Sequence, residues 1–146
     1  GLGAPHWAPD ARGTLTGLTR GTEQGHIARA TLDAMALQNA DILRVMQKDL
    51  GRKMQPLRVD GGAAQNDLLM QIQADVLGHR LIRPAVTETT VAGACYLAGL
   101  AVGVWNSPAE VKKIWQSDRE FRVQMKAADR RKRLASWETA LQRTLM

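Results

Sequence analysis

The chain contains few of the residues from which self-contained active sites are usually built. It has one cysteine and three histidines among 146 residues, which excludes an internal disulfide. The histidines lie far apart in the sequence, and no His–Cys–carboxylate spacing typical of a metal site is present. A Walker phosphate loop, a Gly-X-Ser-X-Gly elbow and a Gly-X-Gly-X-X-Gly fingerprint are all missing. We therefore predict no metal ligand and no complete catalytic set among these residues.

Aromatic residues and long apolar runs are scarce as well. One phenylalanine, one tyrosine and four tryptophans make up 4% of the chain, and they form no interleaved pattern for stacking nucleic-acid bases. No apolar run approaches the roughly 18 residues that span a bilayer, and no charged-then-apolar leader precedes a cleavage site. We therefore expect a soluble, cytoplasmic protein that neither inserts into a membrane nor binds nucleic acid.

The formal net charge of +6 raises the question of an acidic partner. A basic run, Arg130-Arg131-Lys132-Arg133, lies within residues 127–145. Apolar residues recur there at helical spacing: Leu134, Trp137, Leu141 and Leu145. We interpret the basic run as the solvated face of an amphipathic helix. The alternative is a nucleic-acid-binding module, whose affinity would fall steeply with salt.

Helical patterns alternate with short extended segments along the chain. The predicted helices cover residues 23–50, 65–77, 88–103, 108–116 and 127–145. Strands are predicted at residues 14–18, 57–60 and 80–82, with a connector or short strand at 118–123. This alternation indicates an α/β fold in one domain. Because the strands are few and the chain begins without Met in a Gly/Pro-rich loop, we expect a fragment whose remaining strands lie upstream or in a partner.

The helix predicted at residues 88–103 is composed almost entirely of small and apolar residues. Such a composition indicates burial, and we expect Cys95 to be a small buried residue within it. Gly93 and Gly99 weaken helix propensity by about 1 kcal/mol each relative to alanine, so we expect them to allow close approach of a neighbouring backbone or a ligand, with close packing as the favoured reason.

Residues 58–70 give the strongest indication of a ligand site. A short apolar run ends at Gly61-Gly62, and an amphipathic pattern follows, which predicts a strand, a tight turn and a helix. Bare backbone and a helix N-terminus favour a nucleotide, although a plain structural turn has the same pattern. Asp60 could orient metal-bound water or fix the turn, and Asn66 could bind a ligand or cap the helix.

Two segments near the N-terminus resemble motifs of the carbohydrate kinase superfamily. Residues 4–7 are Ala-Pro-His-Trp and residues 11–13 are Ala-Arg-Gly, similar to a glycerol kinase loop in which an aromatic residue stands in place of His6. Residues 13–18, followed after seven residues by residues 26–33, fit the superfamily's second signature. This signature is long and specific, so it carries most of the resemblance.

Two further segments resemble the glycerol kinase family within that superfamily. The turn at residues 59–63, with Asn66 and residues 70–71, is closer to the glycerol kinase version than to the serine- and glycine-rich turn of sugar kinases. The helix at residues 88–103 is likewise similar to its glycerol kinase counterpart. The resemblance covers nearly the whole chain and favours glycerol over pentuloses as acceptor.

The resemblance implies a fold and an activity. The chain, residues 1–146, would be the C-terminal part of a ribonuclease H-like ATPase domain of the actin/hexokinase type, with helices packed on a short mixed sheet. The intact protein would be an ATP- and Mg²⁺-dependent kinase that converts glycerol to glycerol 3-phosphate, and a homo-oligomer. A related kinase acting on a pentulose or another polyol is the alternative.

The resemblance also assigns residues. Gly62 and Asn66 match positions that contact the adenine nucleotide, with Gly61 and Ala63 completing a backbone wall. The catalytic carboxylate, the glycerol-binding residues and the first phosphate loop lie upstream in the family. None of them matches here, so we expect the fragment alone to be inactive.

Overall fold

The computed structural model describes residues 1–52 and 56–146. It contains a three-stranded sheet of order β1-β2-β3, formed by Leu57–Arg58, Leu81–Pro84 and Ser117–Phe121. β1 is parallel to β2, and β3 is antiparallel to β2. The predicted short mixed sheet is therefore confirmed. The sequence left residues 118–123 open between a connector and a strand, and β3 shows that a strand forms there.

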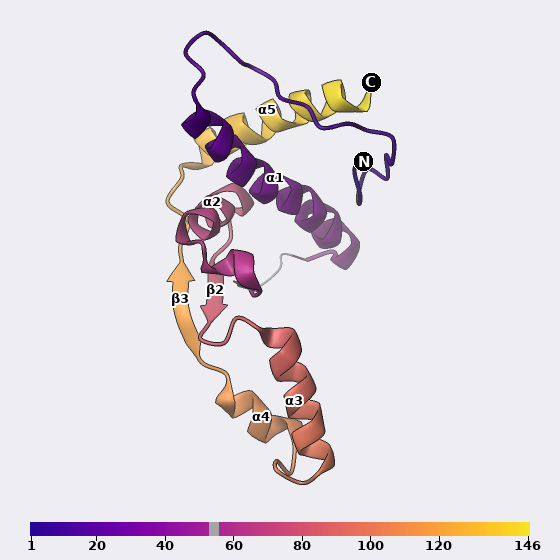
Figure 1. Ribbon diagram of the computed structural model, residues 1–146, viewed down its shortest axis with the longest axis vertical. Coiled ribbons are helices and arrows are strands. Elements are labelled where there is room, and N and C mark those ends of the chain that lie inside the picture. Colours follow the sequence, from indigo (N-terminus) through magenta and orange to yellow (C-terminus); the bar gives the residue numbers. More distant parts are fainter. Residues whose placement is uncertain (53–55) are drawn as a thin grey trace.

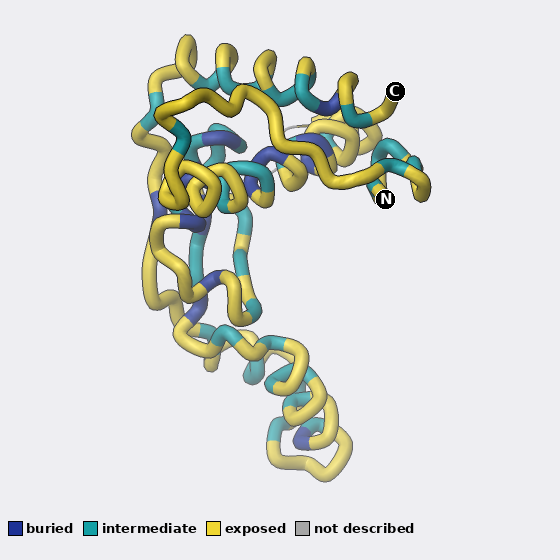
Figure 2. The backbone as a smooth tube through the Cα atoms, turned by 45° about the horizontal axis from the view of Figure 1, so that its top comes forward, coloured by how far each residue is buried: buried dark blue, intermediate teal, exposed yellow. Residues whose placement is uncertain are grey.

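Besides the strands, the described residues form five α-helices and one 3₁₀ turn. They are α1 (Gln24–Leu50), η1 (Gly62–Gln65), α2 (Asp67–Leu77), α3 (Thr89–Ala101), α4 (Pro108–Ile114) and α5 (Ala127–Leu145). Figure 1 shows α1, α2 and α5 gathered at one end of the molecule, with α3 and α4 at the opposite end beyond the sheet. The molecule is therefore elongated, and its two ends differ in burial (Figure 2).

The ends of α1 lie where the sequence predicts them. The amide of Glu23 donates to Nδ1 of His26 (3.1 Å), which occupies a backbone donor just before the helix. Gly51 follows the last helical residue in the left-handed conformation, and its amide donates to the Lys48 carbonyl (3.3 Å). A glycine adopts that conformation without steric cost, so Gly51 ends the helix.

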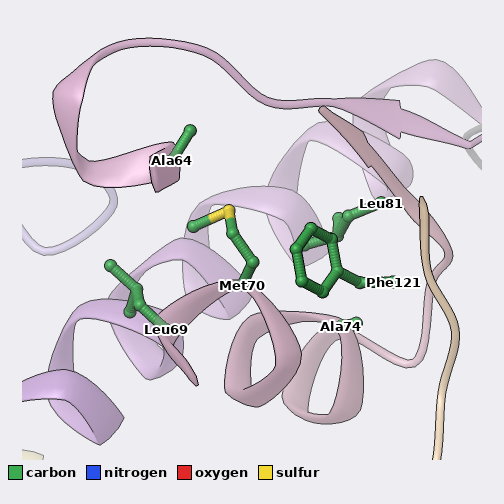
Figure 3. Close-up of a cluster of buried hydrophobic side chains, with 6 residues drawn as sticks. All are labelled: Ala64, Leu69, Met70, Ala74, Leu81 and Phe121. Carbon is green, nitrogen blue, oxygen red and sulfur yellow. The ribbon is translucent and has the colours of Figure 1, made fainter. Parts of the chain in front are cut away.

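Two apolar clusters hold the helical end together, with α2 contributing to both. The first joins α2 to the sheet and η1 (Figure 3) and contains Ala64, Leu69, Met70, Ala74, Leu81 and Phe121. The second joins α2 to α1 and contains Ala36, Leu37, Ile72 and Val76, with Leu134 and Trp137 of α5 packed against it. Since α2 buries side chains in both clusters, it is the central element of the fold.

A buried carboxylate connects α1 to α5. Asp41 is 5% exposed, and its Oδ2 accepts from Nε1 of Trp137 (2.7 Å) while its Oδ1 accepts from Arg44 (3.1 Å). Nε2 of His6 lies 3.6 Å from Asp41 Oδ2, which brings the N-terminal segment onto the same group. A charge buried this deeply needs such partners, so Asp41 fixes how α5 lies on α1.

The predicted burial of residues 88–103 is wrong for the described structure. α3 forms, but with α4 it projects from the sheet, and its one buried residue is Gly99. Leu97 is 71% exposed, and Cys95, which the sequence predicts to be buried, is exposed. Apolar composition leads to burial only where a partner surface packs on the helix, and the described residues place none over these side chains.

The two glycines of α3 differ in their surroundings. A Cβ on Gly99 would overlap the ring of Trp105, so this ring packs on bare backbone. The predicted close packing is thus observed, with a side chain rather than a backbone as the neighbour. Tyr96 meets the same ring edge-on, with the ring centroids 5.5 Å apart. A Cβ on Gly93 would meet open space among the described residues, so the close packing predicted there is not observed.

Two strand predictions require correction. Residues 14–18 belong to no strand, and Leu15 and Leu18 are exposed, because alternation alone supplies no neighbouring strand to pair with. Pro84, expected to follow the second interior strand, is its last residue. The register with β3 shifts between Arg83 and Pro84, and a proline is tolerated at such an irregularity.

The C-terminal helix follows the predicted amphipathic pattern. Leu141 is buried, Leu134 and Trp137 are partly buried, and the middle of the basic run, Arg131 and Lys132, is exposed. Arg133 lies 3.3 Å from Asp33 of α1 and so contributes an ion pair. Among the helices of the described ranges, none is long and apolar enough to cross a membrane.

The core assignment predicts a large loss of stability for one substitution. Leu81 is 0% exposed in β2, so Leu81→Ala should lower the free energy of unfolding by about 2–5 kcal/mol through the lost contacts and the cavity. Leu68→Ala is the matched control, because Leu68 is 51% exposed on α2, and it should cost about 0.5 kcal/mol or less. Urea unfolding followed by circular dichroism measures both, and equal losses would contradict the core described here.

Candidate functional site

β1 leads into a tight turn at its carboxyl end. The amide of Val59 donates to the Ile82 carbonyl (3.1 Å), continuing the ladder past β1. The amide of Gly61 then donates to the Thr87 carbonyl (2.8 Å), which closes the turn against the segment before α3. The helix predicted from residue 65 begins instead at Asp67, because η1 occupies residues 62–65.

Glycine at the two positions of the turn has to be explained separately, because the two backbones differ. Gly61 has φ 80° and ψ 172°, a combination that only glycine adopts readily. Gly62 has an ordinary φ and is exposed, and a Cβ on it would meet open space. Gly61 is therefore required by backbone conformation, whereas the fold leaves room for a side chain at position 62.

Asn66 caps α2. Its Oδ1 accepts from the amide of Leu69 (3.0 Å), and its backbone is extended, as in helix N-caps. Of the two roles that the sequence left open, capping is therefore observed. The residue is also exposed beside the turn, so ligand contact stays a prediction.

Side chains tie the turn to the start of α3. The hydroxyl of Thr89 donates to the carboxylate of Asp60, and Nε2 of Gln65 donates to the hydroxyl of Thr87 (3.3 Å). Asp60 therefore fixes the turn, which is one of the two roles considered for it. These contacts hold both flanks of the exposed backbone at Gly62 and Ala63.

Arg83 supports the turn from β2. Its Nη1 donates to the carbonyl of Ala64 in η1 (2.9 Å) and to Oδ1 of Asp67 (2.8 Å), and its Nε donates to Oδ2 of Asp118 (2.7 Å). The hydrogen bond to Asp118 is the main reason that the pKa of Arg83 is raised above its ordinary value, although burial lowers it, and Asp67 raises it further. The guanidinium therefore stays charged.

The structure brings the four predicted residues, Gly61, Gly62, Ala63 and Asn66, to one turn, with backbone exposed at its tip. Sequence reasoning missed Arg83, Thr87 and Thr89 as its supports. No local motif marks these residues, because they reach the turn from β2 and from the α3 side. In the part of the chain that is described, no group of three or more His, Cys, Asp or Glu residues could hold a metal ion.

The fold is that of the C-terminal domain of a carbohydrate kinase family. The model of the FGGY family of carbohydrate kinases, C-terminal domain, matches residues 1–102, and the chain belongs to this family. The superfamily assignment made from the sequence motifs is thus confirmed, and with it the actin/hexokinase-type fold.

The most similar proteins include several glycerol kinases. The glycerol kinase of Dechloromonas aromatica is 59% identical over 146 residues, covering 99% of this chain and 29% of that protein. That of Bdellovibrio bacteriovorus is 57% identical over 143 residues, covering 98% and 29%. The crystal structure of Plasmodium falciparum glycerol kinase with ADP has a TM-score of 0.89 at 37% identity, covering 100% and 29%. The chain thus spans 29% of the length of these relatives.

The conformational difference between the two glycines is testable. Gly61→Ala should lower the free energy of unfolding by on the order of 1–3 kcal/mol, because alanine is strained at this φ and ψ. Gly62→Ala is the matched control and should change it by about 0.5 kcal/mol or less, since its methyl group meets open space. Thermal or urea unfolding of both variants gives the comparison. A stable Gly61→Ala variant would show that the turn adopts another conformation.

Proposed function

We propose that this chain is the nucleotide-binding C-terminal part of a two-domain glycerol kinase. The intact enzyme transfers the γ-phosphoryl group of ATP to glycerol, giving glycerol 3-phosphate. The observation that carries the proposal is the 59% identity, over 99% of this chain, to a protein named glycerol kinase. The exposed glycine turn at the end of β1 is the feature of this chain that suits such a role.

In this proposal the turn forms one wall of the nucleotide site. Gly61, Gly62 and Ala63 present backbone, and Asn66 contacts the nucleotide beside them. Two observations support the assignment: Gly62 and Ala63 are exposed, and the space next to Gly62 is open. A ligand can approach a glycine backbone more closely than that of any other residue. The solved relative with TM-score 0.89 carries ADP.

The role of this chain in phosphoryl transfer is to bind and orient. MgATP supplies the transferable phosphoryl group, with Mg²⁺ neutralising charge on the phosphates. Since no metal-holding group of three acidic, His or Cys residues occurs in the described part of the chain, we propose that Mg²⁺ is held by the phosphates and by residues outside it. The catalytic base and the glycerol-binding residues also lie outside, so the chain alone is inactive. We place the enzyme in the cytoplasm as a homo-oligomer.

Acceptor competition tests the substrate assignment. The full-length protein, given MgATP with glycerol, xylulose or ribulose at equal concentrations, should form ADP with a kcat/KM for glycerol about a hundredfold above the others. The reason is that buried polar groups shaped for one polyol are left unpaired by another. Faster turnover with a pentulose would support the kinase activity and contradict glycerol as its acceptor. No turnover with any acceptor would leave only the family assignment.

Gly62→Val in the full-length enzyme tests the nucleotide wall. The added side chain would occupy the space next to the backbone, so the KM for ATP should rise by about tenfold, equivalent to about 1.4 kcal/mol. Gly3→Val is the matched control, since a Cβ on Gly3 also meets open space but lies outside the turn. Thermal unfolding verifies that both variants fold. An unchanged KM for ATP in folded Gly62→Val would remove the turn from the site.

A further inference from the structure

One side chain of β2 joins the three elements that surround the turn. Arg83 contacts Asp118 of β3, Asp67 at the start of α2, and the carbonyl of Ala64 in η1, through donor–acceptor distances of 2.7, 2.8 and 2.9 Å. Its side chain is 12% exposed. The guanidinium also lies 5.5 Å from the centroid of the Phe121 ring, within the range of a cation–π contact. The group is therefore held on several sides.

The three contacts have unequal consequences. Asp67 and Asp118 keep about half of their side chains exposed, so water can replace the arginine at both carboxylates. Ala64 is buried at 1% exposure, and its carbonyl accepts from Arg83 at the inner side of η1. Losing that donor leaves a carbonyl in a buried residue to find another partner. The bond to η1 is therefore the contact that water replaces least easily.

Arginine suits this position better than lysine would. Its planar guanidinium has five donors in fixed directions, and here Nε, Nη1 and Nη2 all have acceptors. The carboxylates of Asp67 and Asp118 fix the plane of the guanidinium group. In this orientation Nη1 points at η1. A lysine ammonium has no fixed fork with which to convert two ion pairs into a directed third bond.

We propose that Arg83 is a positioning residue that holds the nucleotide-binding turn in shape before the nucleotide arrives. It fixes η1 from the sheet side, while the bond from Gly61 to Thr87 (2.8 Å) fixes the beginning of the turn. The backbone of Gly62 and Ala63 is then preorganised between these two points, which lowers the entropic cost of binding. This inference rests on the proposed function, because it takes the turn to be the nucleotide wall.

The test compares Arg83 of β2 with Arg80, which directly precedes β2, in the full-length enzyme. Arg83→Met keeps an unbranched apolar stem and removes all of the side chain's donors. Arg80→Met is the matched control, because Arg80 pairs with Glu120 on β3 (2.5 Å) and has no contact with η1 among the described residues. Both variants lose an ion pair to β3, and only Arg83→Met also loses the contacts with Asp67 and with the Ala64 carbonyl.

Arg83→Met should raise the KM for ATP and the Kd for ADP by about tenfold, with the KM for glycerol unchanged, because one charge-assisted bond no longer orders the turn. Hydrogen exchange should become faster in a peptide covering residues 59–66 and stay unchanged in one covering residues 70–77. Arg80→Met should change none of these quantities. Equal effects of the two variants, or faster exchange in both peptides, would reduce Arg83 to a general stabilising residue and overturn the proposal.

A second variant decides the matter if Arg83→Met fails to fold. Asp118→Ala removes one of the two carboxylates that orient the guanidinium and weakens the direction of the bond to Ala64, so the KM for ATP should rise about threefold, with faster exchange at residues 59–66. Unchanged values in folded Asp118→Ala would overturn the proposal.

The Gly62→Val variant distinguishes a failure of the positioning role of Arg83 from a failure of the proposed nucleotide wall. If Gly62→Val weakens nucleotide binding and Arg83→Met does not, only the positioning role of Arg83 is contradicted. If Gly62→Val has no effect, the turn is not the nucleotide wall, and the role of Arg83 loses its basis as well.

Discussion

The packing of α2 on two sides is the constraint on which the rest of the structure depends. Met70 and Ala74 contribute to the cluster that faces the sheet, whereas Ile72 and Val76 contribute to the cluster shared with α1. A helix that buries two faces cannot shift along one neighbour without losing contacts on the other. The N-terminus of α2 is thereby fixed in space, and with it the end of the turn that precedes the helix.

The turn converts this packing into a possible binding surface. Between the end of β1 at Arg58 and the start of α2 at Asp67, the backbone adopts the positive φ of Gly61, and Asn66 caps the helix. Polar bonds from Arg83 and Thr89 then hold the two flanks. The exposed tip at Gly62 and Ala63 thus lies between two hydrogen-bonded flanks. In the proposed nucleotide site, these bonds would lower the entropic cost of binding.

Local sequence signals predicted most elements of the helical end, because caps and periodicity act over a few residues. Glu23 and Gly51 bound α1 as predicted, and the strand–turn–helix order around Gly61 was also correct. The antiparallel pairing of β3 and the reach of Arg83 to η1 depend on contacts 19 to 40 residues apart. Such contacts are decided by the packing of whole elements, so no local pattern could indicate them.

The exposed side of α3 shows why hydropathy predicts burial only with respect to a complete set of partners. Its apolar composition favours packing against another surface, and composition carries no information on where such a surface lies. Gly99 found its partner in Trp105, close along the chain, whereas Gly93 and Leu97 face open space. The relatives extend over more than three times the length of this chain. The hydrophobic effect acts on the assembled protein rather than on one segment. The same apolar helix can therefore be exposed in this chain and covered in a longer kinase.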